Sequence, residues 1–127
     1  MEPRDQAVQA LYELDQRHST AVPADLSAKA RRLVVGVLEY RSSLDTEINA
    51  ASKNWTVDRM PVVDRSILRL GTYELFYEPA TPVAVVLNEA VRLAKLFSTE
   101  KSGGFVNGVL ASISRIHESS AANESAN

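Results

Sequence analysis

The sequence contains no cysteine. This absence excludes disulfides, thiolate metal sites and cysteine nucleophiles, and it fits a protein of the reducing cytoplasm. Only two histidines are present, His18 in a predicted loop and His117 near the C-terminal end, and neither has the spacing from carboxylates that a metal site needs. No serine stands in the nucleophile turn of a hydrolase. The sequence therefore predicts no catalytic residue, no metal and no cofactor.

Long apolar runs and an excess of positive charge are also missing. The longest apolar run, residues 82–87, is far shorter than the roughly 20 residues needed to cross a bilayer. Residues 1–5 lack the basic and apolar regions of a secretory signal, so we expect a cytoplasmic protein with no membrane contact. Lys and Arg total 14 against 16 Asp and Glu, a net charge of −2. Any nucleic-acid site must therefore be local.

The apolar residues recur at the three-to-four spacing of amphipathic helices, and no segment alternates as a strand does. This pattern predicts helices over residues 4–14, 24–38, 42–51, 61–76, 82–96 and 103–116. Gly36 indicates a close approach of another helix. Segment 61–76 is apolar nearly all round except for a narrow strip of Arg65, Arg69 and Thr72, so we expect it in the middle of a bundle.

Length and composition predict one all-α domain. A chain of 127 residues with 45% hydrophobic content is large enough for a core of its own. We place this domain over residues 1–118 and expect short connectors between neighbouring helices. Residues 119–127 are small and polar, and we expect them to form a disordered tail.

The stretch around Gly103 and Gly104 is the clearest candidate site. We expect Ser102 to cap a helix that starts at Gly103. The first N–H groups of a helix lack partners and carry partial positive charge, so such a start beside Lys101 can receive a phosphate. Phe105 can then offer its ring to a base. The alternative from local geometry alone is a glycine turn followed by a core phenylalanine.

Several blocks of sequence together carry a family resemblance. They are AVQALY at 7–12, DRSILRL at 64–70 with YEL at 73–75, NEAVRLAK at 88–95 and FVNGVL at 105–110, and Trp55 fits as well. In this order the chain resembles the NusB family of transcription antitermination factors, from residue 4 to about residue 116. The resemblance implies a compact, non-catalytic fold of about seven helices in two packed bundles.

The resemblance also implies a function. It implies binding to the single-stranded boxA element of nascent ribosomal RNA transcripts, together with the small-subunit ribosomal protein NusE. The complex is then loaded onto elongating RNA polymerase with other Nus factors. Transcription of rRNA operons would thereby ignore termination signals, and maturation of the rRNA would be assisted.

Five residues are implied to contact RNA. Phe105 matches a family aromatic near the RNA, and Lys101, Ser102 and Gly103 occupy the loop that lies against boxA. Arg4 matches the arginine-rich N-terminal stretch that grips RNA phosphates in many NusB proteins.

Two further residues match positions that contact NusE. Tyr12 and Asp64 are implied to do so by hydrogen bonds and ion pairing. From the residues alone, Tyr12 can instead edge the core, and Asp64 can be a first-turn helix acid favoured by the dipole.

The chain departs from the family at its beginning, because only Arg4 precedes the first apolar block. We expect RNA binding by this chain alone to be weaker and less salt-dependent than in an arginine-armed relative, with NusE completing the site. One explanation is a start codon assigned too far downstream. The other is reliance on Arg17, Arg31 and Arg32.

Two other functions stay open. The chain could be a detached version of the NusB-like domain of rRNA cytosine methyltransferases. Such domains tend to end in Asn-Ala-Val-Leu-Arg where this chain has Asn-Gly-Val-Leu-Ala at 107–111, which favours a free-standing NusB. The second alternative is a helical protein-interaction scaffold without RNA binding, which the acidic balance supports.

Overall fold

The computed structural model describes the backbone of residues 2–53 and 55–126 and side chains as far as residue 119. Within these residues the structure is all-α, as predicted, with no strand. Its elements are α1 (Pro3–Arg17), α2 (Ala28–Ala51), the 3₁₀ turn η1 (Val57–Arg59), α3 (Val62–Tyr77), α4 (Val83–Phe97) and α5 (Glu100–Ala126). The expectation of about seven helices is wrong, since the described residues form five α-helices. None of these helices has the length and apolar character that a membrane crossing needs.

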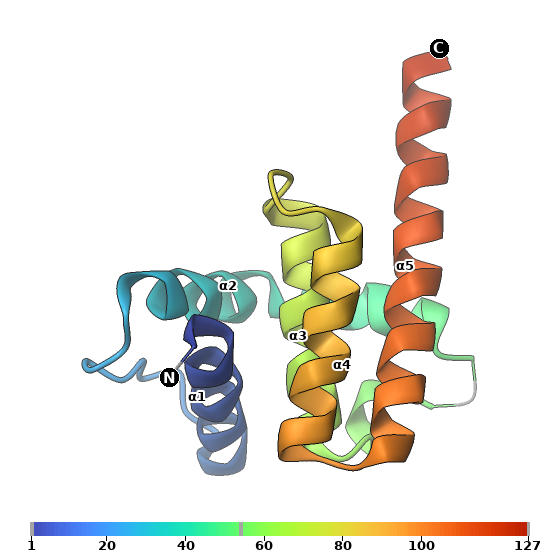
Figure 1. Cartoon of the computed structure of the whole chain (residues 1–127). Helices are drawn as coiled ribbons and strands as arrows, with labels where there is room; N and C mark the ends of the chain where they lie inside the picture. Colours follow the sequence, from blue (N-terminus) through green and yellow to red (C-terminus); the bar gives the residue numbers. More distant parts are fainter. Residues whose placement is uncertain (1, 54, 127) are drawn as a thin grey trace.

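Helix α3 lies in the middle of the bundle, as its nearly uniform apolar pattern predicts. It packs against α1, α2, α4 and α5. Helix α1 lies on one side of α3 and α5 on the other, and α2 crosses behind to reach both sides (Figure 1). The 24 residues of α2 span about 36 Å, which is why one helix can connect the two sides.

Apolar side chains from all five helices meet in one core. Each fully buried leucine or isoleucine contributes about 1.5–3 kcal/mol to folding relative to an exposed one. Two glycines permit the closest approaches: a Cβ on Gly36 would overlap the ring of Tyr73, and a Cβ on Gly71 would lie 2.7 Å from Leu110. The close approach predicted for Gly36 is confirmed. The largest fully buried side chains are Leu33, Leu44, Ile48, Ile67, Leu68, Leu70, Leu93, Leu110 and Ile113.

The predicted break between helices 24–38 and 42–51 is wrong, because α2 is continuous. Hydroxyl groups near the expected break bond back to the preceding turn instead of capping a new helix. Ser43 Oγ donates to the carbonyl of Tyr40 at 2.9 Å, and Thr46 Oγ1 donates to the carbonyl of Ser42 at 3.0 Å. The start of α2 also differs, since Ser27 caps it by accepting from the N–H of Ala30 at 3.2 Å.

Helix α5 continues beyond its predicted end at residue 116. Its backbone is helical through Ala126, where the sequence pattern predicted a disordered tail from residue 119. Alanine and glutamate are good helix formers, and no glycine or proline after Gly108 ends the helix. In Figure 1 the last turns of α5 project beyond the rest of the bundle. Asn127 lies outside the described residues, and the domain boundary at 118 stays a prediction.

Candidate nucleic-acid interface

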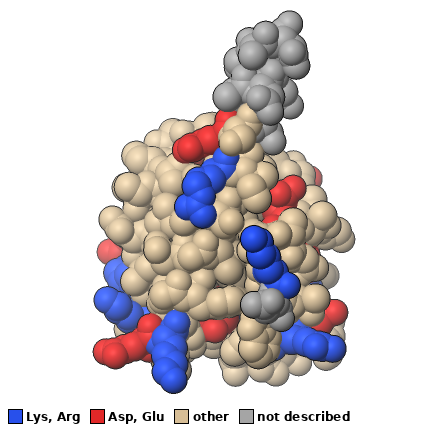
Figure 2. All heavy atoms as spheres, turned by 90° about the vertical axis from the view of Figure 1, so that its right-hand side faces the viewer, with Lys and Arg blue, Asp and Glu red and all other residues tan. Residues whose placement is uncertain are grey.

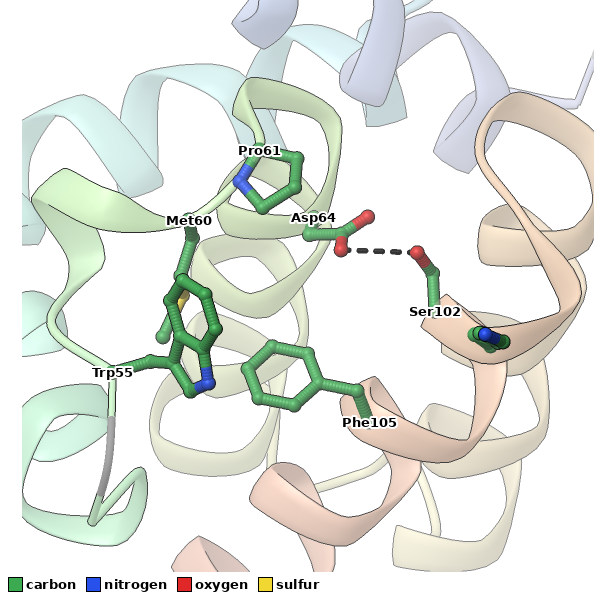
Figure 3. Close-up of a pocket in the computed structure, with 7 residues that line it drawn as sticks. Trp55, Met60, Pro61, Asp64, Ser102 and Phe105 are labelled. Carbon is green, nitrogen blue, oxygen red and sulfur yellow. Dashed lines mark hydrogen bonds between the residues drawn. The ribbon is translucent and has the colours of Figure 1, made fainter.

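An open apolar pocket lies between the start of α5 and the segment that leads into α3. Its volume is about 260 Å³. Trp55 and Phe105 point toward one another across it from different elements (Figure 3). We call it the aromatic pocket. Its lining consists of Trp55, Met60, Pro61, Asp64, Lys101, Ser102 and Phe105.

The start of α5 differs from the predicted one. The helix begins at Glu100, and the N–H of Ser102 donates to Thr99 Oγ1 at 3.2 Å, so Thr99 caps it. Thr99 is a favoured capping residue, and the Glu100 carboxylate suits the positive end of the helix. The expectations that Ser102 is the cap and that the helix starts at Gly103 are therefore wrong. Gly103 lies within the helix rather than at its start, and RNA contact by Ser102 and Gly103 stays a prediction.

Asp64 and Ser102 form the polar inner wall of the aromatic pocket. Asp64 is only 4% exposed and lies in the first turn of α3, which confirms its interpretation as a first-turn acid. It accepts a hydrogen bond from Ser98 Oγ at 2.9 Å. It accepts another from Ser102 Oγ at 3.0 Å, which Figure 3 shows. These bonds tie the beginning of α3 to the α4–α5 connection and fix the pocket's shape.

The remaining predicted RNA residues of α5 are accessible from the pocket. Lys101 is exposed, and Phe105 is half-buried, packing one part of its ring against the core. The ring of Phe105 contacts the core on one side and lines the pocket on the other, and its contact with RNA stays a prediction. Sequence reasoning missed Trp55 as a site residue. The sequence does carry a signal for Trp55, because the only tryptophan of the chain lies in a polar connector.

Arg4 does not line the aromatic pocket. Its guanidinium donates to Glu74 through Nη2 to Oε1 at 2.8 Å and through Nε to Oε2 at 3.0 Å, and this hydrogen bond raises the pKa of Arg4. On the same helix Asp5 accepts from Arg92 Nη2 at 2.7 Å. Arg4 and Asp5 thereby hold α1 against α3 and α4.

A second group of ion pairs holds the other end of α1. Asp15 accepts from Arg65 Nε at 2.7 Å and from Arg69 Nη1 at 3.2 Å, and Arg69 also pairs with Asp45 at 2.8 Å. Burial disfavours the charged form of Asp15. The hydrogen bonds from Arg65 and the positive charges of Arg65 and Arg69 outweigh that effect and hold the pKa of Asp15 below its usual value. Arg92 also pairs with Glu89. We call both groups together the charged seam: Arg4, Asp5, Asp15, Asp45, Arg65, Arg69, Glu74, Glu89 and Arg92.

Tyr12 lies at a second hollow, between α1, α3 and α4. This hollow has a volume of about 450 Å³, and Tyr12 is 38% exposed. Asp64 does not line it, so the structure does not bring Tyr12 and Asp64 into one cavity. We call it the Tyr12 hollow. Its lining consists of Val8, Gln9, Tyr12, Glu13, Val63 and Phe97.

Comparison with known proteins agrees with this arrangement. Residues 1–115 match the model of the NusB family. The chain belongs to the NusB family. The transcription antitermination protein NusB of Geobacillus kaustophilus is 42% identical over 120 residues, which cover 88% of this chain and 92% of the relative. Family membership makes the chain a transcription antitermination protein rather than an enzyme.

Two solved NusB structures are similar to this chain along most of its length. NusB of T. maritima is 34% identical with a TM-score of 0.77, covering 89% of each chain. The other is a crystal structure of the antitermination factors NusB and NusE in complex with dsRNA. It is 29% identical with a TM-score of 0.78 and covers 90% of this chain and 94% of that one.

Proposed function

We propose that this chain binds single-stranded boxA RNA of nascent ribosomal RNA transcripts through its aromatic pocket and does so together with NusE. The complex acts on elongating RNA polymerase with other Nus factors in the cytoplasm. It carries transcription of rRNA operons past termination signals and supports rRNA maturation. The observation that carries this proposal is an open aromatic pocket, with an exposed lysine beside it, in a NusB-family chain.

The chemistry of the pocket suits unpaired RNA. Single-stranded RNA has bases that can be splayed onto an aromatic ring, and Phe105 offers such a ring. The exposed ammonium of Lys101 suits a neighbouring phosphate. Figure 2 shows the face that includes α5, where basic side chains stand apart among uncharged and acidic ones. Recognition at one pocket therefore fits this surface better than a basic coat.

NusE is the protein partner of the proposal. A similar NusB has been crystallised with NusE and RNA. In this chain the exposed Tyr12, beside an open hollow, supports a contact there. Asp64 is 4% exposed and bonded to two serines, so we infer that it supports the partner surface by holding the start of α5.

The family resemblance implies that Arg4 contacts an RNA phosphate, but its contacts in the structure favour a different role. A phosphate would compete with Glu74, which already accepts its hydrogen bonds. We infer that Arg4 orients α1 against α3 instead of contacting a phosphate.

The function is tested by fluorescence anisotropy of a labelled boxA RNA titrated with this chain, with and without NusE, at two salt concentrations. The competitors are a scrambled RNA and a boxA duplex. We expect selective binding of the single strand that NusE strengthens. Equal binding of boxA and scrambled RNA in both conditions would favour the scaffold function. Preference for the duplex would contradict the single-strand assignment.

Phe105→Ala tests the pocket in the same assay. We expect RNA affinity to fall about fivefold to a hundredfold, the range of one lost base stack. Because the ring is half-buried, we expect a stability loss of roughly 1–2 kcal/mol, below the cost of a full core phenylalanine. A full core cost with unchanged RNA affinity would make Phe105 purely structural.

Tyr12→Ala tests the partner surface. We expect it to reduce the gain in RNA affinity that NusE gives, with binding of RNA alone unchanged. Gln16→Ala, an exposed position one turn further along α1, is the matched control. An unchanged NusE effect in Tyr12→Ala would remove the Tyr12 hollow from the partner surface.

A further inference from the structure

We propose that Trp55 is a second RNA-contacting residue, and that one unstacked nucleobase lies against its indole and the ring of Phe105; we call this seat the base slot. This inference rests on the proposed function and extends it to the connector between α2 and η1. It assigns the aromatic pocket as the seat of a single base rather than as a general surface patch.

The first observation is an exposed tryptophan without a role in the core. Trp55 is 51% exposed, and the hydrophobic core does not include it, although it includes its neighbours Val57 and Met60. In Figure 3 the indole points from the connector toward Phe105 on α5. An aromatic ring held over open apolar space has surface available for a flat partner.

The connector presents this ring on anchored backbone. The N–H of Trp55 donates to the carbonyl of Ser52 at 3.1 Å, and the N–H of Val57 donates to Asn49 Oδ1 at 2.8 Å. Val57 and Met60 are only 2% and 4% exposed, so the residues that follow the indole are embedded in the core. The backbone that carries Trp55 is therefore held in place by the fold.

The features around the pocket favour a nucleobase over a protein side chain. Two neighbouring aromatic rings offer apolar surface on which a base can stack, and exposed Lys101 lines the same pocket and suits its phosphate (Figure 3). At the inner wall the Asp64 carboxylate is only 4% exposed, and each of its oxygens accepts a hydrogen bond from a serine hydroxyl, so little of it reaches the pocket surface.

The helix beside the pocket also has room for a sugar-phosphate chain. Lys101, Gly104, Phe105 and Gly108 share one face of α5, since they are spaced by three and four residues. A Cβ added to Gly104 or Gly108 would meet nothing within 4 Å. Bare backbone thus flanks the ring of Phe105 and lets a strand approach closely.

The chain carries its own probe for this contact, because Trp55 is its only tryptophan. Stacking of a base on indole quenches its fluorescence. In a titration with single-stranded boxA RNA, with and without NusE, we expect quenching of Trp55 to follow the RNA anisotropy curve. RNA binding without any change in Trp55 emission would overturn the base slot and leave the proposed function standing. A change caused by NusE alone, with none added by RNA, would assign the pocket to a protein side chain instead.

Substitutions separate stacking from simple apolar contact. We expect Trp55→Leu to weaken RNA binding about fivefold to a hundredfold and Trp55→Phe to retain most of the affinity. Ile116→Ala is the matched control, since Ile116 is a 47% exposed apolar residue on α5, about 16 Å along the helix from Phe105. Thermal unfolding of each variant checks that it is folded.

The outcomes distinguish this inference from the function on which it rests. Equal affinity of Trp55→Leu and the unchanged chain would overturn the base slot while RNA binding itself persists. Failure of the unchanged chain to bind boxA selectively, with or without NusE, would overturn both.

Discussion

The charged seam and the aromatic pocket lie on the same bundle and use their side chains in opposite ways. In the seam, partly buried carboxylates and guanidinium groups pair with each other across α1, α2, α3 and α4. In the pocket, the polar groups are bonded among themselves at the inner wall, and the aromatic rings face open space. The charged groups of the seam have their partners within the chain, whereas the aromatic rings of the pocket leave apolar surface uncovered.

This difference teaches where binding capacity remains. A guanidinium already bonded to a carboxylate gains little from a phosphate, because binding it would leave the carboxylate unpaired in a partly buried position. An exposed indole loses nothing inside the protein when a ligand covers it. We therefore expect variants of the seam to change stability and variants of the pocket to change binding.

The largest expected effect is the loss of Asp15. Asp15→Ala leaves Arg65 and Arg69 without their shared acceptor, so we expect the free energy of unfolding to fall by about 3–5 kcal/mol in a urea titration followed by circular dichroism. RNA affinity of the folded protein should stay the same. Arg32→Ala is the control, because Arg32 pairs with Glu78 while 57% exposed, and we expect a loss of about 0–1 kcal/mol. Equal losses in both variants would contradict the importance of burial in the seam.

Two glycines provide a second contrast. Gly71→Ala places a Cβ 2.7 Å from the fully buried Leu110, so we expect a loss of roughly 1–3 kcal/mol. Gly104→Ala meets open space inside a helix, so we expect a gain of about 0.5–1 kcal/mol. Thermal unfolding measures both. If RNA lies against α5, Gly104→Ala should also weaken RNA binding despite its higher stability. A stability loss in Gly104→Ala would show that its face of α5 is already covered.

We expect low pH to reduce the stability that the charged seam contributes through Asp15. The folded pKa of Asp15 lies below its unfolded value, so its contribution to stability is present above an unfolded pKa of about 3.9 and is lost as the pH falls through the folded pKa. We expect the urea midpoint of Asp15→Asn to fall less than that of the unchanged chain between about pH 5 and pH 3. Parallel curves for the two proteins would show that Asp15 does not contribute to the acid response.

The smallest expected effect concerns Lys101. If its ammonium meets one phosphate, Lys101→Ala should reduce the slope of log affinity against log salt by about 0.7, with no change in stability. Lys95→Ala, an exposed lysine on α4, is the comparison. An unchanged slope in Lys101→Ala would remove the phosphate contact from the proposal.

The helices that were predicted well are those whose signals are local. The predicted helices 4–14, 61–76 and 82–96 lie close to the observed α1, α3 and α4. Their signals are the apolar period and, for the last two, Pro61 and Pro82, and both kinds of signal act between residues that are close in sequence. The helix starts that were predicted wrongly are those where a serine or threonine hydroxyl can bond to more than one nearby backbone group. Ser43 bonded back into α2 instead of starting a helix, and Thr99 rather than Ser102 capped α5.

The sequence by itself determined the all-α class, the family and the central position of α3, because periodicity and blocks of residues are properties of neighbours in the chain. Only the tertiary structure decided which charges are paired and which rings meet. Arg4 pairs with Glu74, which is seventy positions away in the sequence, and Arg65 pairs with Asp15, which is fifty positions away. Trp55 faces Phe105 only after α3 and α5 have packed together. Contacts at such separations follow from how the helices pack in space, and no local pattern encodes them.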